Sequence, residues 1–165
     1  VPLEKIKRVW LDSHSQTSIR LIRILAQRYW NLKWQYVPAK EGFENVVIKG
    51  ADAGVCIGDK VFTVEHRYTF KYDLAEEWIR FTGLPFVFAA WASKKQVDSD
   101  LISRLDAAQL AGIKAIPGIA RDWSQKVNLS ESEIRDYLNH NISYPFTREK
   151  KEGMELFHSF IRDLS

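Results

Sequence analysis

A short hydroxyl-rich segment, residues 12–18, holds the side chains in this sequence that are best suited to bind a charged ligand. It reads Asp-Ser-His-Ser-Gln-Thr-Ser and lies between a predicted strand and a predicted helix. The first N–H groups of a helix lack partners within the helix, and the helix dipole makes that end partly positive. Hydroxyl and amide donors beside such an end favour a carboxylate or phosphate ligand. We therefore expect Ser15, Gln16, Thr17 and Ser18 to bind the substrate, although helix capping alone needs only one of them.

Asp59 is the candidate catalytic residue. It follows Gly58 at the end of an apolar run, residues 53–57, that predicts a buried strand. Ligands of open α/β sheets bind beyond the carboxyl ends of the strands, where an aspartate can bind a substrate hydroxyl or transfer a proton. An Asx-turn or a helix cap is the alternative role for this residue. His14 is the only one of the four histidines that falls in a candidate site segment.

The sequence predicts no metal, no cofactor and no disulfide bond. Its four histidines lack the spacing of a metal site, and the single cysteine, Cys56, has no second cysteine with which to form a disulfide or a metal site. Cys56 lies in the apolar run before Gly58, which indicates a buried structural thiol rather than a nucleophile. The serine-hydrolase turn, the phosphate-binding loop of nucleotide hydrolases and the glycine-rich dinucleotide motif are all absent from the sequence.

Composition and charge indicate a globular protein with a small anionic ligand. Hydrophobic residues make up 45% and charged residues 27% of the 165 residues, which suits one ordinary domain. The formal charge of +3 favours an anion weakly, while the scattered basic residues indicate no nucleic acid partner. The sequence shows neither a signal peptide nor an apolar stretch that could span a membrane, which predicts a cytoplasmic protein without a membrane partner. We expect the protein to be a monomer or a homodimer.

Apolar periodicity divides the chain into an alternating first part and a helical second part. Predicted strands cover residues 7–11, 33–37, 53–57 and 84–92. Predicted helices cover residues 18–30, 43–49 (where a strand is the alternative) and 73–81. Helices alone follow, over residues 98–116, from residue 130 onward and over residues 147–164. The fold class is therefore α/β, a mixed sheet flanked by helices and followed by a helical C-terminal segment.

Four segments together resemble the chorismate dehydratase family, which acts first in the futalosine route to menaquinone. The segments are residues 12–18, residues 57–59, residues 73–74 with Trp78, and residues 82–91. Their order and approximate spacing are similar to the family across most of the chain, and the set is more specific than any one of its members. The helical second part resembles the family only in its pattern.

The resemblance implies a fold similar to the two-lobed periplasmic binding proteins of the second type. In that arrangement residues 1–92 form an inserted α/β lobe that carries the anion-binding segment, and residues 93–165 are helices that pack on the other lobe. In the family, the N-terminal segment of that other lobe carries further substrate-binding residues. This segment has no counterpart in the sequence, so we expect the chain to be part of a longer protein.

The resemblance also implies an activity, the loss of water from chorismate to give 3-[(1-carboxyvinyl)oxy]benzoate, without a metal or an organic cofactor. Chorismate is a dianion, and the N–H groups of Thr17 and Ser18, with the hydroxyls of Ser15 and Thr17, would bind one carboxylate. Asp59 would contact the ring hydroxyl that leaves. Two alternatives remain. One is a non-catalytic protein of the same fold that binds small anions. The other is the related 1,4-dihydroxy-6-naphthoate synthase, which residues 57–59 fit less well.

Overall fold

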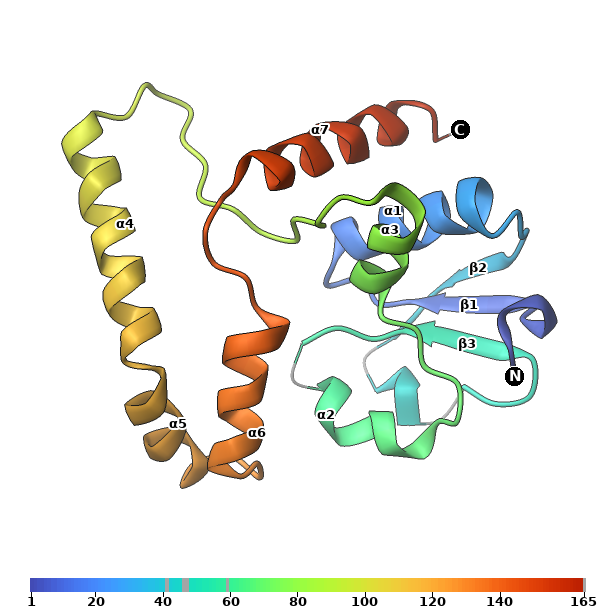
Figure 1. The fold of residues 1–165 in the computed structure, drawn as a ribbon. Coiled ribbons are helices and arrows are strands. Elements are labelled where there is room, and N and C mark those ends of the chain that lie inside the picture. The colour runs from blue at the N-terminus through green and yellow to red at the C-terminus, as the bar shows by residue number, and fades with distance from the viewer. Residues whose placement is uncertain (41, 46–47, 59, 165) are drawn as a thin grey trace. The chain divides into compact units, whose positions relative to one another are not determined.

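The chain folds into two units, one built on a β-sheet and one built of helices. The computed structural model describes residues 1–40, 42–45, 48–58 and 60–164, and at residue 65 it describes the backbone alone. Contacts group Val1–Ala90 with Thr147–Ser165 as the first unit and Trp91–Phe146 as the second (Figure 1). The protein is therefore α/β, as the sequence predicts. No helix in the described part of the chain is both long enough and apolar enough to cross a membrane.

Three short strands form the sheet of the first unit: β1 (Arg8–Leu11), β2 (Gln35–Pro38) and β3 (Asp52–Val55). The central strand β1 pairs in parallel with both neighbours, so the sheet is parallel rather than mixed among the strands described. Parallel pairing brings Leu11, Pro38 and Val55 to the same edge of the sheet. This edge, at the carboxyl ends of the strands, is where open α/β sheets bind ligands. The predicted strands at residues 7–11, 33–37 and 53–57 are confirmed.

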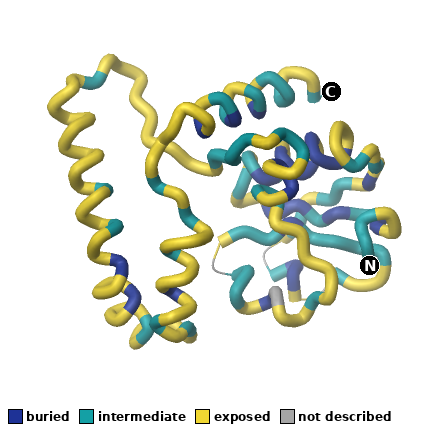
Figure 2. The backbone as a smooth tube through the Cα atoms, in the orientation of Figure 1, coloured by how far each residue is buried: buried dark blue, intermediate teal, exposed yellow. Residues whose placement is uncertain are grey.

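Helix α1 (Gln16–Ile24) lies between two parts of the apolar core and continues as a π-helical turn, η2 (Leu25–Tyr29). One face joins the cluster formed with the strands, whose buried members are Ile6, Val9, Leu11, Ile22, Ala26, Trp34 and Val55. The other face joins a second cluster, whose buried members are Leu21, Ile24, Leu25, Trp78 and Phe157. Figure 2 shows this concentration of buried positions along α1 and the central strand β1. The predicted helix at residues 18–30 is confirmed, and it begins two residues earlier.

Trp78 lies at the centre of the second cluster. It belongs to α3 (Leu74–Thr82), and its side chain is fully buried. Its ring packs edge-on against Phe86 and Phe157, with centroid distances of 5.4 and 5.9 Å, in the geometry that aromatic pairs prefer. Phe157 belongs to α7 (Arg148–Arg162), so this aromatic packing joins α7 to the first unit. The predicted helices at residues 73–81 and 147–164 are both confirmed.

The boundary of the first unit differs from the predicted division at residues 92 and 93. That division places all the helices after residue 93 in one segment, whereas α7 packs with the sheet unit and only Trp91–Phe146 forms a unit apart. The long chain separation between α3 and α7 explains the difference, because apolar periodicity shows that a helix has a buried face without showing what covers it. The assignment of residues 1–92 and 93–165 to two lobes of a larger protein stays a prediction.

The predicted strand at residues 84–92 is wrong. This segment has no regular secondary structure and pairs with no strand of the sheet. Phe86 packs against Trp78 and Phe157, whereas Phe88 is 50% exposed and Trp91 is 89% exposed. The apolar run therefore reflects the packing of Phe86 into the aromatic cluster rather than burial within a sheet. A continuous apolar run alone does not distinguish these two uses.

The second unit contains α4 (Ser99–Lys114), α5 (Ile116–Ser124), α6 (Glu131–Asp136) and a π-helical turn, η5 (Tyr137–Asn141). The helix predicted over residues 98–116 ends at Lys114, and a new helix begins with Pro117 in its first turn, where the missing proline N–H is tolerated. Ser130 and Glu133 form the predicted capping box at the start of α6. Helix α4 has no buried residue and exposes Leu101, Ile102, Leu105 and Leu110.

Four short elements complete the described fold: the 3-10 turns η1 (Leu3–Lys5), η3 (Phe43–Asn45) and η4 (Glu65–Arg67), and the helix α2 (Lys60–Val64). The helix favoured over residues 43–49 is thus present only as the 3-10 turn η3, and residues 46–47 lie outside the described part of the chain. Helix α2 follows β3 at the carboxyl edge of the sheet, which makes its first residue, Lys60, relevant to the candidate site.

Replacing Gly153 with alanine is expected to destabilise the first unit by about 1–3 kcal/mol. A Cβ at this position of α7 would overlap the carbonyl oxygen of Pro85, which is backbone and cannot move aside as a side chain can. Gly112 of α4 is the matched control, because a Cβ there meets nothing within 4 Å. Gly112→Ala should stabilise the protein by up to about 1 kcal/mol. Urea denaturation measures both changes, and equal effects of the two variants would contradict the close approach of α7 to Pro85.

Candidate functional site

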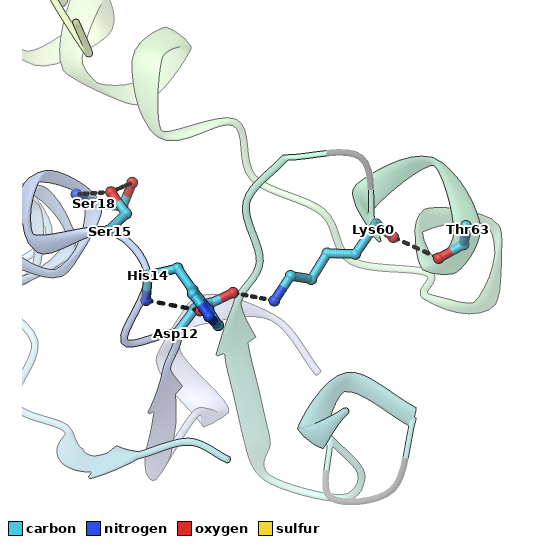
Figure 3. Close-up of polar contacts among 6 residues, drawn as sticks. All are labelled: Asp12, His14, Ser15, Ser18, Lys60 and Thr63. Atoms are coloured by element: carbon cyan, nitrogen blue, oxygen red, sulfur yellow. Dashed lines mark hydrogen bonds and ion pairs between the residues drawn. The ribbon is translucent and has the colours of Figure 1, made fainter. Parts of the chain in front are cut away.

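Ser15 and Ser18 cap the first helix. Ser15 precedes α1 in an extended conformation, and its Oγ accepts a hydrogen bond from the Ser18 N–H at 3.1 Å (Figure 3). The Ser15 hydroxyl also donates to the Ser18 Oγ at 2.9 Å. Ser18 is buried, with 3% of its surface exposed. Two of the four predicted substrate-binding residues thus satisfy each other, which is the capping role that the sequence left open.

Gln16 and Thr17 offer the free donors at this end of the helix. Within the described residues, no hydrogen bond is made by the N–H of either residue. Gln16 is exposed and Thr17 is half-buried, so a ligand can approach both N–H groups together with the Thr17 hydroxyl. The helix dipole adds partial positive charge at the same point. Of the four residues predicted for the anion site, Gln16 and Thr17 thus have backbone N–H groups without a partner among the described residues, whereas Ser15 and Ser18 form the helix cap.

Asp12 organises the loop that leads into α1. It directly follows β1 at the carboxyl edge of the sheet, and only 3% of its surface is exposed. Its Oδ1 accepts a hydrogen bond from the His14 N–H at 3.1 Å and lies 2.7 Å from the His14 Nδ1. Its Oδ2 accepts a hydrogen bond from the Lys60 Nζ (Figure 3). The carboxylate therefore holds the backbone of the loop, an imidazole ring and an ammonium group at once.

The partners of Asp12 keep its carboxyl group ionised. Burial alone acts to raise the pKa of Asp12, but the hydrogen bonds from Lys60 and His14 outweigh it and lower the pKa below its ordinary value. The same pairing raises the pKa of Lys60, chiefly through its hydrogen bond to Asp12. Both groups are thus charged at neutral pH. A buried carboxylate is stable in this form only because its charge is paired and its oxygens are hydrogen-bonded.

The sequence places Asp12 in the candidate binding segment, but its local pattern predicts neither Asp12 nor Lys60 as a site residue. The signal for Asp12 was present, since it follows a strand in the same way as Asp59 does. Lys60 lies 48 positions from Asp12, and only the parallel pairing of β1 and β3 brings them together. Asp59 itself lies outside the residues that the structure describes.

A half-buried thiol lies near the same edge of the sheet. Burial raises the pKa of the Cys56 thiol to about 11, and the nearby Glu44 carboxylate adds to this effect. Such a thiol is protonated at neutral pH and is a poor nucleophile, in agreement with the predicted structural role. Among the described residues, no group of three or more histidine, cysteine, aspartate or glutamate side chains is arranged to hold a metal ion.

The fold and this candidate site define a class of α/β protein. Its members have a helix N-terminus and a polar loop at the carboxyl edge of a parallel sheet, and the donors of this helix end are chemically suited to a small anion. Comparison with known families is more specific. The chain belongs to the menaquinone biosynthesis family, whose family model matches residues 1–163.

Two relatives in this comparison are both named chorismate dehydratase. The protein of Campylobacter jejuni is 28% identical over 109 residues, which cover 64% of this chain. The protein of Thermus thermophilus is 23% identical over 174 aligned positions, which cover 94% of this chain. The matched regions span 48% and 63% of the length of these relatives.

Proposed function

We propose that this protein is a chorismate dehydratase, a hydro-lyase that removes water from chorismate to give 3-[(1-carboxyvinyl)oxy]benzoate. The observation that carries the proposal is the relation to two proteins of that name, one of them across 94% of this chain. Membership of the menaquinone biosynthesis family over residues 1–163 supports the same conclusion. The donors at the start of α1 are chemically suited to the substrate, because chorismate carries two carboxylates.

In the proposed complex, one carboxylate of chorismate binds at the N-terminus of α1. The N–H groups of Gln16 and Thr17 and the Thr17 hydroxyl donate to it, and the helix dipole stabilises its charge. We extend the proposal to Asp59 as the residue that contacts the ring hydroxyl. The elimination forms an aromatic ring, so the protein has to orient the dianion, accept a proton from the ring carbon and assist the departure of hydroxide.

The proposal includes a fold similar to the two-lobed periplasmic binding proteins of the second type, with residues 1–90 and helix α7 in one lobe and the helices of residues 91–146 packing on the other. In such a protein the ligand binds between the lobes, and the carboxyl edge of the sheet in the first unit faces it. The family match and the parallel sheet of the first unit support this arrangement. Its activity would then require the whole length that the relatives have.

The deciding experiment is incubation of the protein at its full native length with chorismate, followed by mass spectrometry. Loss of one water, giving an aromatic enolpyruvyl ether, would support the dehydratase. Tight binding of chorismate without turnover would instead support a non-catalytic anion-binding protein of the same fold. If the protein neither binds chorismate nor converts it, the proposal is wrong.

Gln16→Pro tests the role of the helix N-terminus in the same assay. Proline is tolerated at the first position of a helix, and Ser15 already has the extended conformation that a residue before proline adopts. The variant should therefore keep α1 and its melting temperature while it loses one N–H donor, and its Kd for chorismate should rise about tenfold. Gln16→Ala, which keeps the N–H, is the matched control and should bind nearly as wild type. Equal affinity of all three proteins would remove the helix N-terminus from the site.

A further inference from the structure

Asp12 and His14 form a carboxylate–imidazole pair beside the proposed anion site. The Nδ1 of His14 lies 2.7 Å from the Asp12 Oδ1, and the backbone N–H of His14 donates to the same oxygen at 3.1 Å. Asp12 is almost fully buried, whereas the His14 side chain is 65% exposed. The buried Asp12 carboxylate thus holds the His14 ring at Nδ1, and the other side of the ring is open to a ligand. His14 also lies two positions before Gln16, so the pair and the proposed anion site share one segment of the chain. Figure 3 shows the pair beside Ser15, at the start of α1.

The pair determines which nitrogen of His14 carries the proton. An ionised carboxylate only accepts hydrogen bonds, so Nδ1 must donate, and the neutral ring therefore has a free lone pair on Nε2. Lys60 bonds the other oxygen of Asp12 and so helps to keep the carboxylate ionised. No described residue forms a hydrogen bond with Nε2. This arrangement of carboxylate, imidazole and open nitrogen is the one that general bases of this type use.

We infer that His14 is the general base that takes the proton from the ring carbon of chorismate, and that Asp12 is the positioning residue that sets its tautomer; this inference rests on the proposed function. The C–H bond breaks as Nε2 takes the proton, and its electron pair forms the new ring double bond. The bond between the neighbouring ring carbon and its hydroxyl oxygen breaks, and hydroxide leaves and becomes water by gaining a proton. The imidazolium that forms is stabilised by the Asp12 carboxylate and returns its proton to solvent.

The tautomer can be measured without any substrate. In the ¹⁵N-labelled protein at a pH where the ring is neutral, long-range ¹H–¹⁵N correlations should show the proton of His14 on Nδ1. Asp12→Asn places an amide that can donate opposite the ring, which should shift the population towards a proton on Nε2. A wild-type ring protonated on Nε2 would overturn the inference, whatever the protein does to chorismate.

Turnover of chorismate by the full-length protein supplies the second test. His14→Gln should lower kcat about 100-fold or more while KM changes less than about threefold, because the exposed ring contributes little to the fold. Asp12→Asn should lower kcat comparably, and added imidazole should restore part of the activity of His14→Ala. His140→Gln is the matched control, since His140 is an exposed ring with Asp136 Oδ1 at 3.8 Å from its Nδ1, and it should keep wild-type kcat.

The outcomes separate this inference from the function on which it rests. If the wild-type protein and the His14→Gln variant dehydrate chorismate equally well, another residue is the base. The proposed function would then still hold. A wild-type protein with no turnover would overturn both proposals. A rise in KM alone in His14→Gln would make His14 a binding residue and would overturn its role as base.

Discussion

Replacing Trp78 with alanine is expected to lower the free energy of unfolding by about 3–5 kcal/mol, a large fraction of the stability of an ordinary domain. The side chain is fully buried, and the rings of Phe81, Phe86, Phe157 and Phe160 pack against it at centroid distances of 5.4–6.3 Å. Alanine would leave a large cavity where α1, α3 and α7 meet. The neighbouring rings cannot collapse into it without losing their own edge-on contacts.

Two control variants make this prediction specific. Trp91→Ala removes the same side chain from a position that is 89% exposed and should change stability by less than about 0.5 kcal/mol. Trp78→Phe keeps an aromatic ring and removes the buried indole N–H, which has no hydrogen-bond partner, so it should cost clearly less than alanine. Urea denaturation followed by far-UV circular dichroism measures all three. Similar losses for Trp78→Ala and Trp91→Ala would contradict the central position of Trp78.

Asp12→Ala is expected to destabilise the protein by about 3 kcal/mol, because it leaves the Lys60 ammonium without its partner and removes the acceptor that holds the His14 N–H. The double variant Asp12→Ala/Lys60→Met should lose less than the sum of the two single variants, with a coupling of about 1 kcal/mol or more. Asp100→Ala is the surface control. Asp100 pairs with Arg104 at 4.0 Å with both side chains exposed, and its loss should cost less than about 0.5 kcal/mol.

The same coupling should depend on pH in a direction that the pKa shifts determine. The pKa of Asp12 is lowered from its ordinary 3.8, so its contribution is complete above that value and is lost as the pH falls below it. The pKa of Lys60 is raised from 10.5, so its contribution is complete below that value and is lost as the pH rises above it. The coupling between Asp12 and Lys60 should therefore be constant between about pH 5 and pH 9. A coupling that does not weaken at all as the pH falls below about 3.8 would contradict a charge-based interaction.

Elements with local signals were predictable from the sequence. Asp73 caps α3 and Gly83 ends it with a φ of 73°, while Ser130 with Glu133 and Thr147 start two further helices. Each of these helix ends is decided by hydrogen bonds between residues a few positions apart, so the local sequence is enough to locate the helix ends. The hydroxyl-rich segment at residues 12–18 has local signals of the same kind, since a strand, a capping residue and a helix follow one another directly.

Which elements an apolar segment packs against was not predictable in the same way. Residues 84–92 have the composition of a buried strand, yet Phe86 is held by rings from α3 and α7 and no strand pairs with the segment. Likewise, α7 showed an apolar face in the sequence, but its partner, Trp78, is far away in the chain. Burial depends on which elements meet, and that is decided by the packing of the whole unit.

By itself, the sequence determined the α/β class, the hydroxyl-rich helix start and the family to which the chain is similar. The structure adds how the donors of that helix start are divided, with Ser15 and Ser18 bonded to each other and the N–H groups of Gln16 and Thr17 without a partner among the described residues. Only the tertiary structure decided the environment of Asp12, because the Lys60 ammonium reaches it from 48 positions away across two parallel strands. A charge pair of this kind has no local signature, since its energy arises from burial and proximity that exist only after the sheet has formed.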